Sequence, residues 1–403
     1  MNLFEKFYCR SYQFILNKIA MPFLKIKPPL TLEGEGSITK VASYLKERHF
    51  FRPFIVVTKP LIENGSLIPF LDSLKREGYE PIIFSDVIPN PTFASVLSAL
   101  EIAKKGNCDS IIAIGGGSAM DTAKAIGAML ANKVTNPASL KGLLKVHKRF
   151  PMLIAVPTTA GTGSETTIAA VLVNEKTHDK FSINDPRIMP SLAVLDSTFL
   201  RSLPAFVIAT TGMDALTHAV EAYIGRARTK NTKSYSVQAS RMIFENLAPF
   251  HKDPNNKEAR EKMLKASYLA GAAFTRSYVG YVHALAHALG GTYNVPHGLA
   301  NAILLPIVLR HYGKSVYKPL ARLVDASSLL PYGESIKKKA EAYIAKIEEM
   351  NASFGIEKDF KGTLKEEDIP SLALHAAKEA NPLYPVPKEM NAKELEAILR
   401  ELC

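Results

Sequence analysis

Between residues 54 and 157, short apolar runs alternate with helical stretches, and this order constrains the fold more than any other feature of the chain. Strands are expected at 54–58, 81–84, 110–114 and 152–157, and helices at 61–77, 92–105 and 118–131. Strands separated by helices are joined by right-handed crossovers, so they form a parallel sheet with helices on both faces. Such a sheet binds its ligands at the carboxyl ends of its strands.

After about residue 205, long helical periodicities dominate, and the second half of the chain is predicted to be all-helical. A chain of 403 residues is long enough for two domains. We therefore expect a helical extension over residues 1–30, an α/β dinucleotide-binding domain over residues 31–205, and an all-helical metal- and substrate-binding domain over residues 206–403.

The composition narrows the functional class. The three cysteines lack CxxC spacing, which argues against a disulfide framework or a thiolate zinc site. No apolar run reaches the ~18 residues of a membrane span, and no signal peptide is recognisable, so a cytoplasmic protein is expected. The net charge of +12 is scattered over helical stretches, partly interleaved with acidic residues, as on a solvated face. We therefore expect no nucleic-acid partner.

Residues 1–27 are predicted to form an amphipathic helix in which five Lys and Arg accompany a single acid, Glu5. Its apolar stripe, spaced by three and four residues, consists of Phe4, Tyr8, Tyr12, Ile15, Ile19 and Phe23. Such a helix either packs on protein, its own subunit or a neighbour, or lies on an anionic membrane surface. Packing is the favoured interpretation, and a weak membrane-surface contact is the alternative.

Two polar loops follow two of the expected strands. The sequence IIAIGGGSAMDTAK, at 111–124, runs from a strand through three glycines into a helix, and PTTAGTGSET follows at 157–166. Glycines let backbone N–H groups approach a pyrophosphate, and a helix N-terminus adds partial positive charge. The GxGxxG fingerprint is absent, and one such loop alone could be a tight turn. The two loops together predict a dinucleotide.

Five residues of metal-binding types fall in two helical segments, TGMDALTHAVEAY at 211–223 and YVHALAHALGGTYNVPHG at 281–298. A lone His on an apolar helix is usually a core residue. Burying so many polar groups without a shared ligand would cost ~1–3 kcal/mol for each unpaired one, so a metal is predicted. Imidazole and carboxylate suit Fe(II), Zn(II), Ni(II) or Mn(II). The ion would act as a Lewis acid on an alcohol oxygen, and hydride could then pass to a nicotinamide.

The order of these segments resembles that in the iron-dependent (group III) alcohol dehydrogenase family, which includes lactaldehyde reductases and butanol dehydrogenases. The resemblance runs from about Leu32 to Arg310 and rests on GGGSAMDTAKAI, PTTAGTGSE, ATTGMDALTHAVEAY and HALAHALGGTYNVPHG. It implies hydride transfer between NAD(P)H and a small primary alcohol or aldehyde, with Fe(II) or alternatively Zn(II) as the metal. A homo-oligomer, a dimer or larger, is also expected.

The resemblance assigns roles to individual residues. The implied metal ligands are Asp214, His218, His283 and His297. His287 would lie beside the substrate, where it could relay a proton or contact the cofactor. The implied cofactor-binding residues are Asn90, Gly115, Gly116, Gly117, Ser118, Asp121, Thr158, Thr159, Ser164, Thr167 and Lys180.

Two departures from the family pattern bear on specificity. NAD-preferring members tend to place an Asp where this chain has Lys59. An acid there binds ribose hydroxyls and repels a 2′-phosphate, whereas a cation attracts one, so a slight preference for NADP over NAD is expected. The segment TRSYVG, at 275–280, precedes the ligand helix, and Tyr278 with Tyr281 suggests a partly aromatic substrate pocket.

Two other functions stay open on the sequence. Glycerol dehydrogenases and dehydroquinate synthases have the same two-domain architecture and generally use zinc. The synthase reaction needs a dense set of Lys, Arg and Asn, whereas the surroundings of His283 are apolar. A membrane-peripheral protein that retains the fold without turnover is the other alternative, and the intact ligand set argues against it.

Overall fold

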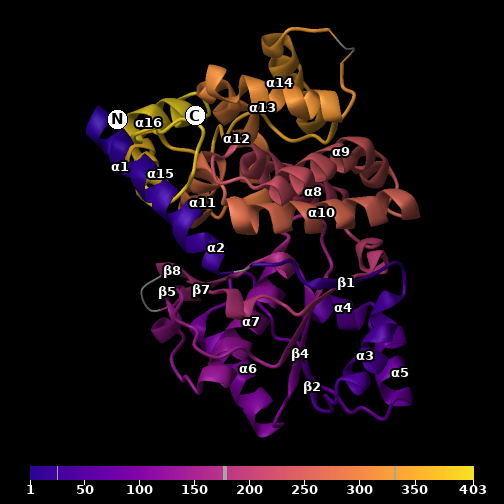
Figure 1. Cartoon of the computed structure of the whole chain (residues 1–403). Helices are drawn as coiled ribbons and strands as arrows, with labels where there is room; N and C mark the ends of the chain where they lie inside the picture. The colour runs from indigo at the N-terminus through magenta and orange to yellow at the C-terminus, as the bar shows by residue number, and fades with distance from the viewer. Residues whose placement is uncertain (25, 176–178, 331–332) are drawn as a thin grey trace. The chain divides into compact units, whose positions relative to one another are not determined.

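The computed structural model describes residues 1–24, 26–175, 179–330 and 333–403 (Figure 1). The chain divides into two compact units. One comprises Lys27–Ser202, and the other joins Met1–Ile26 to Leu203–Cys403. The N-terminal segment is thus part of the helical unit, although the α/β unit separates the two in sequence.

A six-stranded parallel sheet forms the centre of the α/β unit, in the order β1-β9-β6-β4-β2-β3. Its strands are β1 (Leu30–Glu33), β2 (Pro53–Val57), β3 (Ile82–Phe84), β4 (Ser110–Gly115), β6 (Met152–Pro157) and β9 (Leu192–Leu195). Every residue of β2, β4 and β6 is buried, as expected for parallel strands covered on both faces. The predicted fold class, a parallel α/β domain followed by an all-helical one, is confirmed.

The helices of this unit are α3 (Val41–Glu47), α4 (Lys59–Glu63), α5 (Ile68–Arg76), α6 (Phe93–Lys105) and α7 (Gly117–Asn132). The single helix predicted at 61–77 is wrong, because α4 and α5 are separate. Between them Gly65 has a φ of +74°, which residues with a side chain rarely adopt. A small second sheet, which was not predicted, is formed by β5 (Gly142–Leu143), β8 (Asp179–Asn184) and β7 (Ala169–Asn174).

The helical unit is built around α8 (Ala205–Ile224), on which every residue from Gly212 to Ile224 is buried. The polar side chains of this stretch therefore lie in the interior. The helices that follow are α9 (Lys230–Lys252), α10 (Lys257–Ser277), α11 (Tyr281–Tyr293), α12 (His297–Tyr312), α13 (Lys314–Ala326), α14 (Ile336–Ser353), α15 (Ile369–Ala380) and α16 (Ala392–Arg400).

The N-terminal segment is helical, as predicted, through α1 (Leu3–Phe14), a π-helical stretch (Ile15–Ala20) and α2 (Met21–Phe23). Residue 25 of the predicted helix lies outside the described residues. The segment packs on the helical unit with its more polar side: Cys9, Gln13, Asn17 and Met21 are buried. The Gln13 amide donates hydrogen bonds to the carbonyls of Pro382 and Tyr384, at 3.2 and 2.8 Å.

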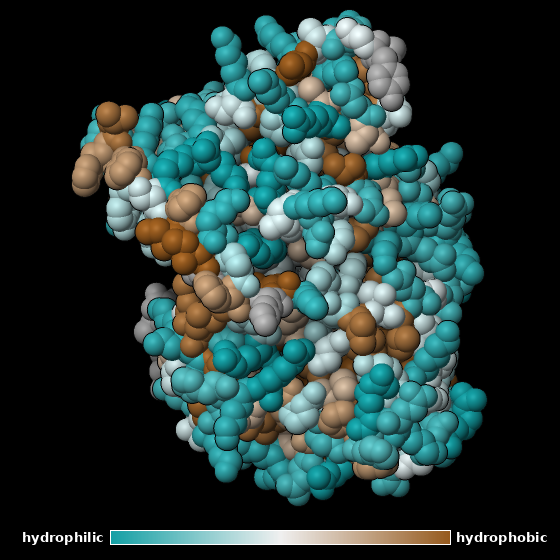
Figure 2. Space-filling view, viewed as in Figure 1, coloured by the Kyte–Doolittle hydropathy of each residue, from teal (hydrophilic) through white to brown (hydrophobic). Residues whose placement is uncertain are grey.

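The apolar stripe of this segment faces away from the subunit. Its six predicted members are between 37% and 79% exposed, so the stripe does not pack on its own subunit, and packing on a neighbouring subunit stays a prediction. Figure 2 shows hydrophobic side chains gathered along the left of the molecule, over α1 and α2. No helix in the described part of the chain is long and apolar enough to cross a membrane.

Candidate active site

Four polar side chains predicted to bind metal converge within the helical unit. Asp214 and His218 lie one turn apart on α8, His283 lies on α11, and His297 is the first residue of α12. Each offers one ligand atom, and these atoms all lie within 4.8 Å of one another. Oδ1 of Asp214 is 4.0 Å from Nδ1 of His218, 3.9 Å from Nε2 of His283 and 3.5 Å from Nε2 of His297.

This donor set fits a divalent metal ion. Imidazole nitrogens and carboxylate oxygens bind such ions at about 2.0–2.2 Å, so atoms around one ion lie roughly 3–4 Å apart. Burial, with the neighbouring histidines, holds the pKa of His283 well below its ordinary value. Its ring is therefore neutral, as a metal ligand must be.

The side-chain amide of Asn301 packs against three members of the cluster. Its Nδ2 lies 2.7 Å from Oδ1 of Asp214, 3.1 Å from Nε2 of His297 and 3.3 Å from Nε2 of His283. Its own Oδ1 is buried and has no hydrogen-bond partner among the described residues. One neutral amide thus faces three acceptors, a position where a cation would satisfy them better.

Glu221, which was not predicted, orients the ring of His283, one of the predicted ligands. Its Oε2 lies 2.6 Å from Nδ1 of His283, and the carboxylate also accepts the N–H groups of Gly280 and Val282, at 2.8 and 2.9 Å. Because Nδ1 of the ring faces this carboxylate, Nε2 is left to face the cluster. Glu221 follows His218 by three residues on the same helix, and that spacing could have revealed it.

His287 lies beside the cluster without belonging to it. Its ring centroid is 6.0 Å from that of His283 and 5.3 Å from that of His297, and its side chain is 44% exposed. Nδ1 lies 2.7 Å from Oε1 of Glu379 on α15, and the hydroxyl of Tyr384 donates to the same oxygen at 2.7 Å. Glu379 is 92 residues away in the chain, so no local pattern could have indicated it.

The hydroxyls of the two tyrosines expected near the substrate contact other parts of the protein. Tyr281 is fully buried, and its hydroxyl accepts the N–H of Met390 at 2.9 Å, so the expectation that it lines a pocket is wrong. The Tyr278 hydroxyl lies 3.5 Å from Sδ of Met21 in the N-terminal segment. Tyr278 has a φ of +62°, a conformation uncommon for a residue with a side chain.

In the α/β unit the two predicted cofactor loops follow neighbouring strands. Gly115 at the end of β4 pairs with Pro157 at the end of β6, so both loops leave the sheet together. A Cβ at Gly115 would lie 2.7 Å from Cβ of Ala119, which the close turn does not allow. These loops bring together Gly115, Gly116, Gly117, Ser118, Thr158 and Thr159. The adjoining N-terminus of α7 has unpaired N–H groups and partial positive charge suited to a phosphate.

A buried lysine that the sequence analysis missed fixes the second loop. Nζ of Lys124 donates to the carbonyl and hydroxyl of Ser164, at 2.7 and 3.0 Å, to the hydroxyl of Thr167 at 2.6 Å, and to the carbonyl of Ala169 at 2.9 Å. Burial lowers the pKa of Lys124 to about 8. Ser164 and Thr167, both predicted cofactor ligands, are therefore part of an internal network.

Asp121 belongs to the same network. Its carboxylate accepts the N–H of Val171 at 3.1 Å and the hydroxyl of Ser164 at 3.3 Å. Burial raises the pKa of Asp121 to about 6, and the positive charge of Lys124 opposes this shift. The other predicted cofactor residues, Asn90 and Lys180, are exposed.

Two family models match the chain. The iron-containing alcohol dehydrogenase model covers residues 28–197, and the C-terminal model of the Fe-containing alcohol dehydrogenase family covers residues 208–403. The chain belongs to the iron-containing alcohol dehydrogenase family. Like other members, it is a metal-dependent oxidoreductase acting on alcohols and aldehydes. Residues 1–27 precede both matched regions, so the N-terminal segment is an addition to the family domains.

Individual relatives agree with this assignment. The chain is 37% identical to 1,3-propanediol dehydrogenase of Citrobacter freundii, over 93% of this chain and 97% of that one. It is 35% identical to lactaldehyde reductase of Escherichia coli, over 84% of this chain and 89% of that one. Among solved structures, 1,3-propanediol oxidoreductase superposes with a TM-score of 0.90 at 36% identity, over 93% and 98%. Sulfoacetaldehyde reductase from Bifidobacterium kashiwanohense, in complex with NAD⁺, superposes with a TM-score of 0.84 at 28% identity, over 94% of this chain and 98% of that one.

Proposed function

We propose that this chain transfers hydride between NAD(P)H and a small primary alcohol or aldehyde, with Fe(II) held by Asp214, His218, His283 and His297. The convergence of these four side chains carries the proposal. The bound ion supplies Lewis acidity toward the alcohol oxygen, and the nicotinamide supplies the hydride acceptor. Zn(II) binds the same donors more tightly than Fe(II), so it is the expected alternative metal.

The residues around the cluster have separate roles in this proposal. Glu221 holds the ring of His283 in the orientation that directs Nε2 to the ion. His287 carries the proton between the alcohol hydroxyl and solvent, because its ring is partly exposed beside the cluster. Glu379 and Tyr384 keep that ring in place through the hydrogen bonds at its Nδ1 side.

For the cofactor, the proposal places the pyrophosphate at the start of α7, against the backbone of Gly115, Gly116, Gly117 and Ser118. The hydroxyls of Thr158 and Thr159 supply further hydrogen bonds from the neighbouring loop. Lys124 and Asp121 keep the second loop in shape through Ser164 and Thr167. Asn90 and Lys180 would complete the set from the surface of the unit.

We further propose that NADP(H) is slightly preferred, because Lys59 at the start of α4 offers a cation to a 2′-phosphate. Its Nζ lies 2.9 Å from Oδ1 of Asp86, so a neighbouring carboxylate shares this charge and the preference is modest. The ratio of kcat/KM with NADPH to that with NADH tests the idea. Asp86→Asn should raise the ratio and Lys59→Gln should lower it; a ratio below one in the wild type would contradict the preference.

The metal is tested on protein purified anaerobically. Metal analysis should find one divalent ion per chain, and an aldehyde-reduction screen with NADPH and NADH should detect turnover. A chelator should remove metal and activity in parallel, and Fe(II) should restore both. Full turnover by metal-free protein would refute the proposal.

A second function is favoured by the exposed stripe of the N-terminal segment. Phe4, Phe7 and Phe23 are 78%, 70% and 79% exposed, and basic residues flank them. We propose a weak contact of this segment with an anionic membrane surface, and separately that the chain forms a homo-oligomer. Vesicle flotation and sedimentation of the whole chain and of a chain lacking residues 1–27 test both. Equal flotation of the two chains would contradict the proposed membrane contact. Sedimentation of the whole chain as a monomer would contradict the proposed homo-oligomer.

A further inference from the structure

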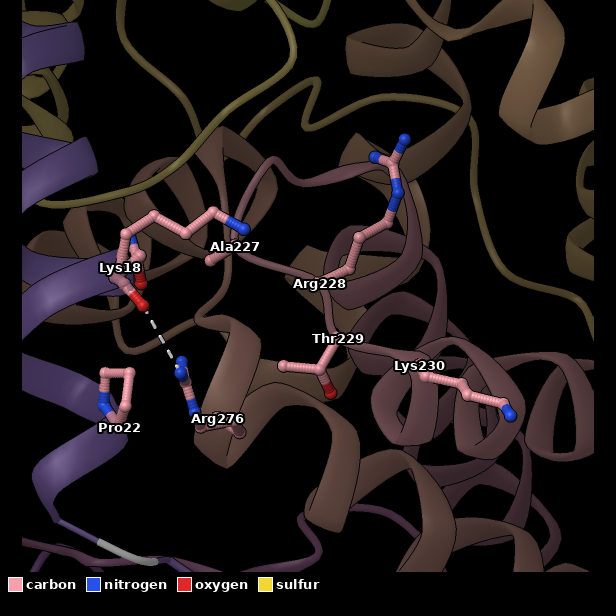
Figure 3. Close-up of a pocket in the computed structure, with 8 residues that line it drawn as sticks. Lys18, Pro22, Ala227, Arg228, Thr229, Lys230 and Arg276 are labelled. Carbon is pink, nitrogen blue, oxygen red and sulfur yellow. Dashed lines mark hydrogen bonds between the residues drawn. The ribbon is translucent and has the colours of Figure 1, made fainter.

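A pocket of about 390 Å³ lies where the N-terminal segment packs on the rest of the helical unit (Figure 3). It is lined by Asn17, Lys18, Pro22, Ala227, Arg228, Thr229, Lys230 and Arg276. Half of these residues are cationic and none is acidic. The volume falls in the range of ~300–1,000 Å³ typical of small-molecule sites.

The cations at this pocket differ in their partners: Nη1 of Arg228 donates to the carbonyls of Ile224 and Gly225 at the end of α8, at 3.1 and 2.7 Å. None of the four cations forms an ion pair with a carboxylate in the part of the chain that the structure describes. Arg226 and Arg322 lie near enough to act on Arg228, whose pKa is lowered by burial and also by these two positive neighbours. Clustered cations without counter-charges create a positive potential that attracts anions.

Donors approach the pocket from two sides. Figure 3 shows Lys18 and Arg276 on one side and the loop 227–230 on the other, with the side chains of Arg228 and Lys230 extending away. Nη2 of Arg276 donates to the carbonyl of Asn17 at 3.3 Å, while its Nη1 is buried without an acceptor among the described residues. Opposite it, α9 begins at Lys230 behind a capping box, in which the hydroxyl of Thr229 accepts the N–H of Thr232 at 3.2 Å. The N–H groups of Lys230 and Asn231, the first two residues of the helix, have no acceptor within it.

We propose that this pocket binds a phosphate group. Lys18 and Arg276 would contact it from one side, and the N–H groups of Lys230 and Asn231 at the start of α9 from the other. A tetrahedral anion with several acceptor oxygens can engage a guanidinium, an ammonium and helix N–H groups together. Arg228 and Lys230 add positive potential at the rim. The site is distinct from the proposed cofactor loops and does not depend on the proposed hydride transfer, because Lys18 lies outside the family domains.

The phosphate group could belong to either of two kinds of ligand: a soluble phosphate compound or the headgroup of an anionic phospholipid. One structural observation favours the headgroup. Lys18 lies on the same segment as Phe14, Ile15 and Ile19, whose side chains are 61%, 56% and 52% exposed. A lipid bound in the pocket would let these side chains reach the acyl region.

Calorimetric titration of the whole chain with inorganic phosphate tests the site, with NAD⁺ saturating so that the cofactor loops are occupied. One phosphate should bind, and Lys18→Gln and Arg276→Gln should each weaken binding by about tenfold or more. Lys314→Gln is the matched control for a third variant, Lys230→Gln, since both lysines are exposed at the first position of a helix. Lys230→Gln should weaken binding and Lys314→Gln should not. Equal affinities in all of these proteins would overturn the assignment.

A second arm separates the two sources. Flotation is measured with vesicles of phosphatidylcholine alone and with vesicles that also contain phosphatidylglycerol, at constant ionic strength. Flotation with the anionic vesicles only, weakened by Lys18→Gln and by added phosphate but not by added chloride, would identify the headgroup as the ligand. Phosphate binding without flotation would identify a soluble compound. Absence of both phosphate binding and flotation would overturn the proposal.

Discussion

The two buried polar clusters of this molecule are stabilised in opposite ways. In the helical unit, Asp214 and three imidazoles face one another, and the group nearest their centre is a neutral amide, that of Asn301. In the α/β unit, Lys124 donates to four oxygens and lies close to the carboxylates of Asp121 and Glu165. Buried acceptors need a compensating positive group. The second cluster has its cation within the chain, whereas the first offers ligand atoms to the imported ion that we propose, and such an ion would be available for chemistry.

Removing a ligand from the first cluster should have the largest effect. His218→Ala leaves three ligands and opens space beside Phe274, on which the ring of His218 stacks at 4.1 Å. A bound metal contributes several kcal/mol to the reaction, so turnover should fall on the order of 10³-fold or more, together with the metal content. Metal analysis and kcat/KM on the same preparation check this.

The exposed His147→Ala is the control for this change, since it removes an imidazole from the α/β surface. It should leave metal content and turnover unchanged. Normal metal content in His218→Ala would show that the first cluster does not need an imported ion held by this ring.

Removing the cation of the second cluster should instead damage the fold. Lys124→Met leaves Asp121 and Glu165 without their positive partner and the carbonyls of Ser164 and Ala169 without a donor. Breaking a buried pair in this way costs about 3–5 kcal/mol, so the free energy of unfolding should fall by that amount. Urea unfolding measures it, with the exposed Lys105→Met as the control. A loss below about 1 kcal/mol would mean that the network is not held by its lysine.

The pH dependence of stability offers a third comparison. Burial raises the pKa of Glu165 from 4.5 to about 7, with the charge of Lys124 opposing the shift. Between pH 4.5 and about 7 the folded protein keeps a proton on Glu165 that the unfolded chain releases. The raised pKa therefore stabilises the fold fully below pH 4.5, and this stabilisation is lost as the pH rises through about 7. Glu165→Gln does not titrate. Relative to wild type, the variant should therefore gain roughly 3 kcal/mol between pH 4.5 and pH 8, measured by urea unfolding at both values. A constant difference would show that Glu165 keeps an ordinary pKa.

How far the sequence could predict these clusters depends on how their residues are distributed. The alternation of strands and helices is a local pattern, and it predicted the fold class. The spacing of Asp214 and His218 on one helix is also local and indicated a metal site, whereas the set of four ligands was implied by the resemblance to the family. Lys124 stands in a run that looks like an ordinary amphipathic helix, and Glu379 is 92 residues from the histidine that it contacts. Such partners come from tertiary packing, which no local spacing encodes.

The prediction for the N-terminal segment was incomplete for a different reason. Its apolar period was recognised correctly, but periodicity does not say which face is buried. Gln13 can be buried because its amide donates to two carbonyl acceptors, a tertiary contact that periodicity does not reveal. The same reasoning applies to Tyr281, whose aromatic ring suggested a pocket although its hydroxyl is bonded in the core.

The smallest expected effect concerns Glu221, which tests whether the first cluster also depends on a carboxylate behind its ligands. Glu221→Gln keeps the shape of the side chain but leaves one oxygen to serve two backbone N–H groups and the ring of His283. The ring then loses its fixed orientation, and metal affinity should fall about 10–100-fold, as for other outer-shell partners of metal-bound histidine. Competition with a chelator of known affinity measures this without relying on turnover. The exposed Glu348→Gln, which loses only a surface pair with Arg310, should bind metal as the wild type does. If Glu221→Gln also kept the wild-type affinity, the four ligands would be oriented by the helices alone.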